Sequence, residues 1–354
     1  MNTSRSLKNM QGMAGMGILA ALMVVSVVTV IAVKQSWQNE LDMLRSGHRW
    51  AGMQADAYIR GAEQLAVLVL EKDKQTNKFD SIHDQEKEFW NTPIESPTDV
   101  GALRIAVTDL QGRINLNALG TPDQKDPDGK HLGSALKYSE QQRRFIRFLQ
   151  TIPLDDDGTV MDVSTAEGIL DAVRDWVDAD SNVSGFAGAE ADYYSGLEVP
   201  ISISNGPMTS TSELLHIKGM TPRLFMGLRP YVNVLPATAE LNINTMDQVL
   251  TRGFGGPNDL QPLDETLAGD FYSDIASSAI EKSADIQTIP WIEANYPPSQ
   301  NSQTGMDLSG LTVSSTWFEA DITVSVGDHV RSGRALIDRN GNKVQVVRRS
   351  DSPF

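Results

Sequence analysis

Five carboxylates gather within eighteen residues of the sequence, and their types and spacing suggest that they bind a cation. They lie in the stretch DWVDADSNVSGFAGAEADYY and are Asp175, Asp178, Asp180, Glu190 and Asp192. Asn182 and the carbonyls of a loop with two glycines, Gly185 and Gly188, would add further hard oxygen donors. Calcium takes roughly six to eight such ligands, whereas magnesium needs fewer and stricter partners, so the stretch favours Ca²⁺. The ordinary alternative is a solvated acidic loop that caps helices.

The spacing of these residues departs from that of an EF-hand. Asp178, Asp180 and Asn182 match its first three side-chain positions. Val183, however, replaces the obligatory glycine, and Glu190 falls one place late. The ligand set therefore stays open. Asp175 could instead lie one turn up the preceding helix, and Asp155, Asp156 and Asp157 could join a second ion site.

The composition argues against an enzyme and against a general polyanion binder. The chain has 354 residues, a formal net charge of -16 and no cysteine, which excludes disulfides, thiolate metal sites, iron–sulfur clusters and a cysteine nucleophile. Its five histidines are scattered, and the sequence has no H-E-x-x-H pair, G-x-S-x-G elbow, P-loop or dinucleotide motif. Nucleic-acid affinity rests on Lys and Arg, which are outnumbered here. We expect a protein that is not an enzyme.

An apolar run near the N-terminus is long enough to cross a membrane. Residues 16–33 would span about 27 Å as a helix, close to the thickness of the hydrocarbon core. Arg5 and Lys8 precede the run without any acid, so the N-terminus should stay in the cytoplasm. A secretory signal peptide is the alternative. Against it, no small-x-small cleavage site follows, and a helical pattern without proline continues to Leu70.

Two distant regions show the alternation of β-strands. Leu103–Thr108 and Arg113–Asn117 flank a turn and predict a hairpin. Near the C-terminus, Phe318–Ser325 alternates, and Arg334–Asp338 and Lys343–Arg348 flank an Asn340-Gly341-Asn342 turn. Between the two regions the period is helical, with apolar residues at Phe145, Phe148, Leu149, Ile169, Ala172, Val173 and Trp176. We therefore expect a helical domain inserted into a small antiparallel sheet.

The predicted fold class is α+β, with a long N-terminal transmembrane helix packed on the sheet. The polar stretch from Asp73 to Thr98 is expected to be a loop. The domains expected are a leader at 1–15, a helix at 16–72 with 16–33 in the membrane, the first part of the sheet at 73–118, the helical insert at 119–292, a linker at 293–309 and the C-terminal strands at 310–354.

One motif favours a second function. Leu214–Phe225, with a turn at Gly219, has the pattern of a helix-hairpin-helix, which in some proteins presents backbone N–H groups to a DNA phosphate. Lys218 and Arg223 would then contact phosphates. This makes a membrane-tethered nucleic-acid receptor the alternative function. Loss of residues 1–15, which carry two basic residues and no acid, would leave a net charge of -18, so a structural turn is the favoured interpretation.

The N-terminus resembles a type IV prepilin-like leader, in which a basic segment and a glycine precede an apolar helix. The resemblance implies cleavage by a prepilin peptidase on the cytoplasmic side and methylation of the new N-terminus. Cleavage could follow Gly12 or Gly15. We favour Gly15, with Met16 as the first mature residue, because the apolar run then begins at once. Pilin-like subunits usually carry Glu at the fifth mature position, but here that residue is Ala20. The K component of the type II secretion system likewise lacks this glutamate.

The rest of the chain resembles the same K family (GspK). The similar segments are DLQGRINLNAL at 109–119, the acidic stretch at 175–194, ELLHIKGMTPRLFMGLRPYVNVLP at 213–236 and LNINT at 241–245. The resemblance implies a pseudopilin fold with a SAM-like, helix-hairpin-helix insert that holds one or two calcium ions. It also implies a minor pseudopilin that caps the tip of the periplasmic pseudopilus and supports export across the outer membrane.

The resemblance further implies partners and a location. The partners are the I and J minor pseudopilins, the major pseudopilin and the prepilin peptidase, with no nucleic acid. The expected location is the bacterial inner membrane, crossed once, with the N-terminus cytoplasmic and the C-terminal domain periplasmic. Contact with other pseudopilins should run along the N-terminal helix, through Leu41, Leu44, Trp50 and Tyr58.

Overall fold

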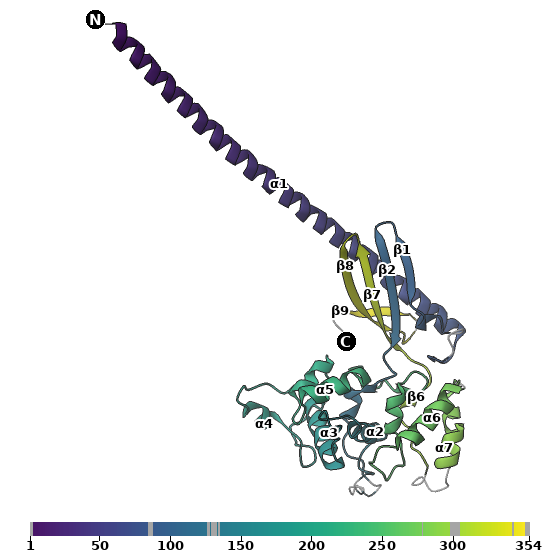
Figure 1. The fold of residues 1–354 in the computed structure, drawn as a ribbon. Helices are drawn as coiled ribbons and strands as arrows, with labels where there is room; N and C mark the ends of the chain where they lie inside the picture. Colours follow the sequence, from purple (N-terminus) through teal and green to yellow (C-terminus); the bar gives the residue numbers. More distant parts are fainter. Residues whose placement is uncertain are drawn as a thin grey trace.

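The computed structural model describes residues 3–83, 88–125, 128, 133, 135–277, 279–297, 305–341 and 343–350, with side chains from residue 16 onward. The chain forms three parts that follow one another in space (Figure 1). A long helix leads from the N-terminus, an antiparallel sheet packs on its second half, and a helical domain lies beyond the sheet. The sequence predicts this mixed helix-and-sheet fold correctly.

Helix α1 runs from Thr3 to Thr76 without a break, four residues past the expected end at residue 72. Every side chain from Met16 to Val33 is exposed. The hydroxyls of Ser26 and Thr29 donate to backbone carbonyls one turn back, each at 2.8 Å, so neither is left unpaired. This half of α1 is long and apolar enough to cross a membrane.

The sheet has five antiparallel strands in the order β1-β2-β7-β8-β9. Their bounds are Ile94–Thr98 (β1), Gly101–Asp109 (β2), Trp317–Val326 (β7), His329–Asp338 (β8) and Gln345–Ser350 (β9). Strands β2 and β7 pair along their whole length, from Gly101 with Val326 to Asp109 with Phe318. Because the strands on either side of the helical domain pair directly, the domain is an insertion between β2 and β7. The predicted C-terminal strands are confirmed.

Small side chains on α1 let the sheet approach the helix closely. Ala51, Ala55, Ala62, Ala66 and Leu70 are buried and follow one face of the helix. They share a core with alternate residues of the sheet, among them Ile105, Phe318, Ile322 and Val324. Because α1 is one continuous helix, it connects its exposed, membrane-length segment directly to the half that packs on the sheet.

The predicted hairpin at residues 103–117 is wrong. Residues 101–109 form β2, but Ile114–Asn115 form a separate short strand, β3, which pairs in parallel with β4 (Val232–Asn233). Alternation identifies an extended segment but does not identify its partner. Here β2 pairs with β1 before it and with β7 far along the chain, and β3 pairs with β4, so the two predicted strands do not pair with each other.

The expected loop from Asp73 to Thr98 is also partly wrong. Asp73 lies in the last turn of α1 and is buried, and a 3₁₀ turn, η1 (Phe89–Asn91), precedes edge strand β1. Residues 84–87 of this stretch lie outside the described part. The polar residues and Pro97 of this stretch predict a loop, but an edge strand tolerates both.

The inserted domain is built from short helices around one core. Its helices are α2 (Glu140–Leu149), α3 (Val163–Val177), α4 (Ala191–Ser195), α5 (Pro222–Leu228), α6 (Glu265–Ser277) and α7 (Pro290–Asn295), with 3₁₀ turns η2 (Leu116–Leu119), η3 (Thr211–His216), η4 (Arg229–Tyr231), η5 (Gln248–Gly253) and η6 (Ser283–Thr288). A capping box of Ser139 and Gln142 starts α2, and Asp162 caps α3. The apolar residues predicted from helical periodicity all lie in this core.

Two short parallel strand pairs join the inserted domain to the sheet. The chain enters through β3, beside β4, and leaves through β6 (Leu311–Thr312), beside β5 (Leu241–Asn242). Asp109 is buried at this junction and accepts hydrogen bonds from the hydroxyls of Thr245 and Ser315. Of the expected linker at 293–309, residues 298–304 lie outside the described part, and residues 293–295 belong to α7.

Candidate metal centre

Three of the five predicted carboxylates meet in the loop between α3 and α4. Asp178 is the C-cap of α3, Asp180 follows it, and Glu190 is the N-cap of α4. One oxygen from each lies within 4.8 Å of one from each of the others. Like charges at this separation repel unless something positive lies between them.

Oxygens of two members of this group, Asp178 and Glu190, are buried and unpaired. Oδ1 of Asp178 and both Oε atoms of Glu190 accept no hydrogen bond from any residue that the structure describes. Glu190 is 6% exposed, and its side chain makes no capping bond to α4. Burial raises the pKa of Asp178 to about 6, with further contributions from Asp180 and Asp175, and burial likewise raises the pKa of Glu190. Unpaired buried carboxylates are costly, so the donor set fits a hard cation.

Asp175 holds the loop in place from the last turns of α3. Its Oδ1 accepts the backbone N–H of Ser184 at 2.8 Å, while its Oδ2 is buried without a partner among the described residues. A Cβ at Gly188 would lie 2.3 Å from that Oδ2, so only glycine fits there. Asp175 is therefore a positioning residue with one oxygen to spare.

The other predicted donors are engaged locally or point elsewhere. Asp192 is exposed in α4 and lies outside the close group. Asn182 donates its side-chain amide to Asp180 at 2.8 Å. In the loop between α2 and α3, Asp155 accepts the N–H of Thr159, and Asp156 forms an ion pair with Arg223.

Asp171 is an acid of this region that the sequence analysis missed. It is buried one turn before Asp175, and its Oδ1 has no hydrogen-bond partner in the described chain. Burial raises its pKa to about 6, against the opposing effect of Arg174. Its spacing of four from Asp175 on one helix face was the available signal. Arg174, in the same helical turn, forms an ion pair with Oδ1 of Asp171 at 3.8 Å.

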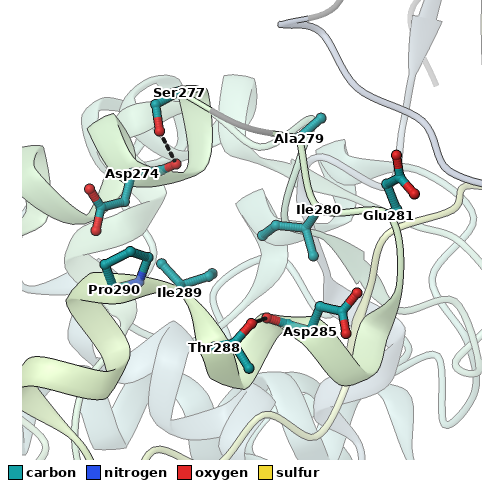
Figure 2. A pocket seen from close by; sticks show the side chains of 9 residues that line it. All are labelled: Asp274, Ser277, Ala279, Ile280, Glu281, Asp285, Thr288, Ile289 and Pro290. Atoms are coloured by element: carbon teal, nitrogen blue, oxygen red, sulfur yellow. Dashed lines mark hydrogen bonds between the residues drawn. The ribbon is translucent and has the colours of Figure 1, made fainter.

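A hollow of about 490 Å³ lies elsewhere in the helical domain, beside α6 and α7 (Figure 2). Its acidic lining residues are Asp274, Glu281 and Asp285. The hydroxyls of Ser277 and Thr288 donate to the backbone carbonyls of Asp274 and Asp285, and Figure 2 shows both turned toward their own helical turns. These groups cap helical turns and do not converge on a common point.

The fold and the site define a class. A membrane-length apolar helix continues into an antiparallel sheet that carries an inserted helical domain with a cluster of acidic side chains, which is the architecture of a large-headed, pilin-like protein. The family model described as "Type II secretion system (T2SS), protein K" matches residues 112–237, a range that includes the acidic loop. Over this range the chain is similar to the type II secretion system protein K family.

Relatives extend the similarity over most of the chain. The type II secretion system protein K of Aeromonas hydrophila is 29% identical over 90% of this chain and 91% of its own length. That of Pectobacterium carotovorum subsp. carotovorum is 29% identical over 86% of both chains. A chain in the crystal structure of the GspK-GspI-GspJ complex from enterotoxigenic Escherichia coli has a TM-score of 0.66 at 22% identity, covering 86% of this chain and 98% of that one. The structural likeness shows that the fold is shared.

Proposed function

We propose that this chain is a minor pseudopilin that caps the tip of the periplasmic pseudopilus of a type II secretion system and supports its assembly for protein export. The observation that carries this proposal is the division of α1 into a bare apolar half and a half packed on the sheet. Such a helix can anchor a rigid head at a membrane and later pack against other helices. The family and the solved relative support the same role.

The anchoring half supports a single pass through the inner membrane, with the head in the periplasm. We further propose cleavage after Gly15, so that Met16 begins the mature chain and its amino group is methylated. Ala20 would then be the fifth mature residue. A tip subunit has no neighbour above it whose amino terminus could neutralise a glutamate there, so alanine avoids an unpaired charge in lipid. N-terminal sequencing that finds a start at Met13 or beyond Val33 would contradict the cut.

The contact surface for other pseudopilins is proposed to be the part of α1 between the apolar run and the sheet. Its exposed apolar side chains are Trp37, Leu41, Met43, Leu44, Trp50 and Met53. Tyr58, expected to contact partners as well, packs partly against the sheet core of its own chain. The solved relative is in a complex with GspI and GspJ, which supports the I and J components as partners here. The major pseudopilin would follow below them.

Calcium is the ion proposed for the α3–α4 loop. Asp178, Asp180 and Glu190 would be its ligands, and Asp175 and Asp192 are the further candidates. When bound, the ion would neutralise the carboxylates and tie the loop to the ends of the two helices. The buried, unpaired oxygens of Asp178 and Glu190 support this assignment.

The alternative of a nucleic-acid receptor has little support. The proposed hairpin has a short 3₁₀ turn, η3, as its first arm, a turn at Gly219 with φ of 85°, and α5 as its second arm. Lys218 donates to the carbonyls of Ala187 and Gly188, and Arg223 pairs with Asp156. Both cations that would contact phosphates are therefore engaged within the chain.

The proposed role is tested by charge substitution on α1. Leu44→Asp and Trp50→Asp, at side chains that are 55% and 62% exposed, should abolish co-purification with the I and J components and block export. Met226→Asp, at a side chain of the helical domain that is 61% exposed, is the matched control and should change neither. Wild-type co-purification and export in both α1 variants would contradict the role.

A further inference from the structure

A second group of carboxylates closes the far end of α1, in the sheet part of the molecule. Asp73 lies in the last turn of α1, Asp80 lies just beyond it, and Glu88 precedes η1. One oxygen from each lies within 4.8 Å of one from each of the others. Their exposed fractions are 1%, 0% and 0%, so this is a deeply buried cluster.

Asp80 and Glu88 each have one oxygen engaged by the fold. Both oxygens of Asp73 are engaged, and its Oδ1 accepts the side-chain amide of Asn77 at 2.8 Å. Arg339, which follows β8, donates to Oδ2 of Asp73 at 2.6 Å and also to Oδ2 of Asp80. The backbone N–H of Ser315 donates to the same Oδ2 of Asp80 at 2.6 Å. The indole of Trp90 donates to Oε2 of Glu88. These contacts fix the orientation of all three carboxylates.

The remaining oxygens point to a missing partner. Oδ1 of Asp80 and Oε1 of Glu88 are buried and accept no hydrogen bond from the described chain. Among the described residues, Arg339 is the only cation that forms an ion pair with the cluster. Three carboxylates against one guanidinium leave two negative charges uncompensated, which equals the charge of one divalent ion. Buried charge of this kind is strongly unfavourable unless it is neutralised.

We propose that Asp73, Asp80 and Glu88 form a second cation site, specific for a hard divalent ion of the Ca²⁺ or Mg²⁺ type. The ligands are oxygens only, as these ions prefer. The site is separate from the α3–α4 loop, because its residues surround the core shared by α1 and the sheet. It does not depend on the function proposed above.

The proposed ion would lock three segments together where α1 ends. Asp73 comes from the helix, Asp80 and Glu88 come from the segment after it, and Arg339 comes from the end of β8. Lys74 already donates to the carbonyls of Arg339 and Gly341, at 2.7 and 2.5 Å, and so fastens the same segments on the outside. An ion bound by these carboxylates would add a further link between the end of α1 and the sheet.

The test counts bound ions in the full chain, purified in detergent. Asp178→Asn and Glu190→Gln together remove ligands of the α3–α4 loop and provide the background. Calorimetric titration of this background with CaCl₂, and separately with MgCl₂, should find one ion per chain for at least one of the two salts. Adding Glu88→Gln should abolish that binding, because the amide keeps an acceptor for Trp90 but loses the charge. Adding Glu95→Gln, an exposed residue of β1, should leave it unchanged.

Three results would overturn the proposal. The folded background could bind neither ion, or Glu88→Gln could leave the ion count unchanged. A proton could also take the place of the ion, since burial raises the pKa of Glu88 to about 8. In that case the melting temperature of the background would change between pH 7 and 9 but not with either salt. If Glu88→Gln fails to fold, Asp80→Asn in the same background provides the second variant and should also lose the ion.

Discussion

Two groups of three carboxylates in this chain have the same close spacing and very different surroundings. In the helical domain, Asp178, Asp180 and Glu190 lie on one loop, and Asp180 is exposed. Beside the sheet, Asp73, Asp80 and Glu88 are fully buried, and an arginine from the end of β8 pairs with two of them. The first group is open to solvent, whereas the second is closed and has one arginine against three carboxylates.

The two groups differ in whether the chain itself supplies a positive partner. The buried group has Arg339, which lies far along the chain from Asp73 and Asp80, and the loop group has no such partner among the described residues. The loop group would depend on the proposed external cation, because the buried oxygens of Asp178 and Glu190 have no partner within the described chain. The buried group would depend first on Arg339 and only then on the proposed ion. Loss of the arginine should therefore harm the protein more than loss of calcium from the loop.

Substitution of Arg339 should give the largest loss in the free energy of unfolding. Arg339→Met would leave Asp73 and Asp80 buried without their cation, and breaking a buried pair in this way costs about 3–5 kcal/mol. Denaturant unfolding of the detergent-solubilised chain should show a loss of that size. Arg104→Met, which breaks the exposed pair with Glu95, is the control and should cost less than about 1 kcal/mol. Equal losses in the two variants would remove the distinction between buried and exposed pairs.

Asp109, between the two regions, should give a pH-dependent effect of intermediate size. Burial raises its pKa to about 6, against the opposing effect of hydrogen bonds from Ser315 and Thr245. Because the folded-state pKa lies above the unfolded one, the native state gains stability below about pH 4 and loses it as the pH rises to about 6. Asp109→Asn should match wild type near pH 4 and be more stable by up to about 3 kcal/mol at pH 7.

Melting curves at pH 4 and pH 7, in the presence of chelator, would test the Asp109 prediction. The chelator keeps both carboxylate groups free of ions, so the difference between variants comes from Asp109. A stability difference that stays constant between the two pH values would mean that Asp109 does not titrate in this range.

Calcium binding at the α3–α4 loop should give the next-largest change in the stability of the folded chain. Saturating calcium should stabilise the wild-type chain by about 2.7 kcal/mol at a hundredfold excess over the dissociation constant, because the ion binds the folded state only. Asp178→Asn or Glu190→Gln should remove the part of the calcium response that comes from the loop, while chelator reverses the whole response in wild type. Thermal melts with CaCl₂ and with chelator measure both. Identical melts of wild type and Glu190→Gln would make the loop a solvated acidic surface.

Substitution of Asp192 should give the smallest effect, a small loss of calcium affinity, and it tests whether this residue is a ligand. The residue is exposed on α4 and lies outside the close group, so Asp192→Asn should weaken calcium binding only through lost long-range charge, by less than about threefold. Glu198→Gln, just beyond α4 and also exposed, is the matched control. A complete loss of binding in Asp192→Asn would show that the loop closes further around the ion.

The sequence was informative wherever the interacting residues are close along the chain. The apolar run at 16–33, the helical faces of α2 and α3, the alternating strand at 318–325 and the acidic loop each follow from a local pattern. A residue on a helix or strand faces the core or the solvent according to a fixed period, so these features can be predicted from neighbouring residues alone. The family resemblance, carried by contiguous segments, was equally accessible.

The tertiary structure alone decided which distant segments meet. Alternation at 103–117 could not indicate that β2 pairs with β7 and β3 with β4, because an extended segment can pair with any free edge. Asp73 was expected in a polar loop, yet it is buried because Arg339, brought to it by the end of β8, compensates part of its charge. Ion-pair and hydrogen-bond partners from remote segments make such burial possible, and these partners cannot be predicted from neighbouring residues in the sequence.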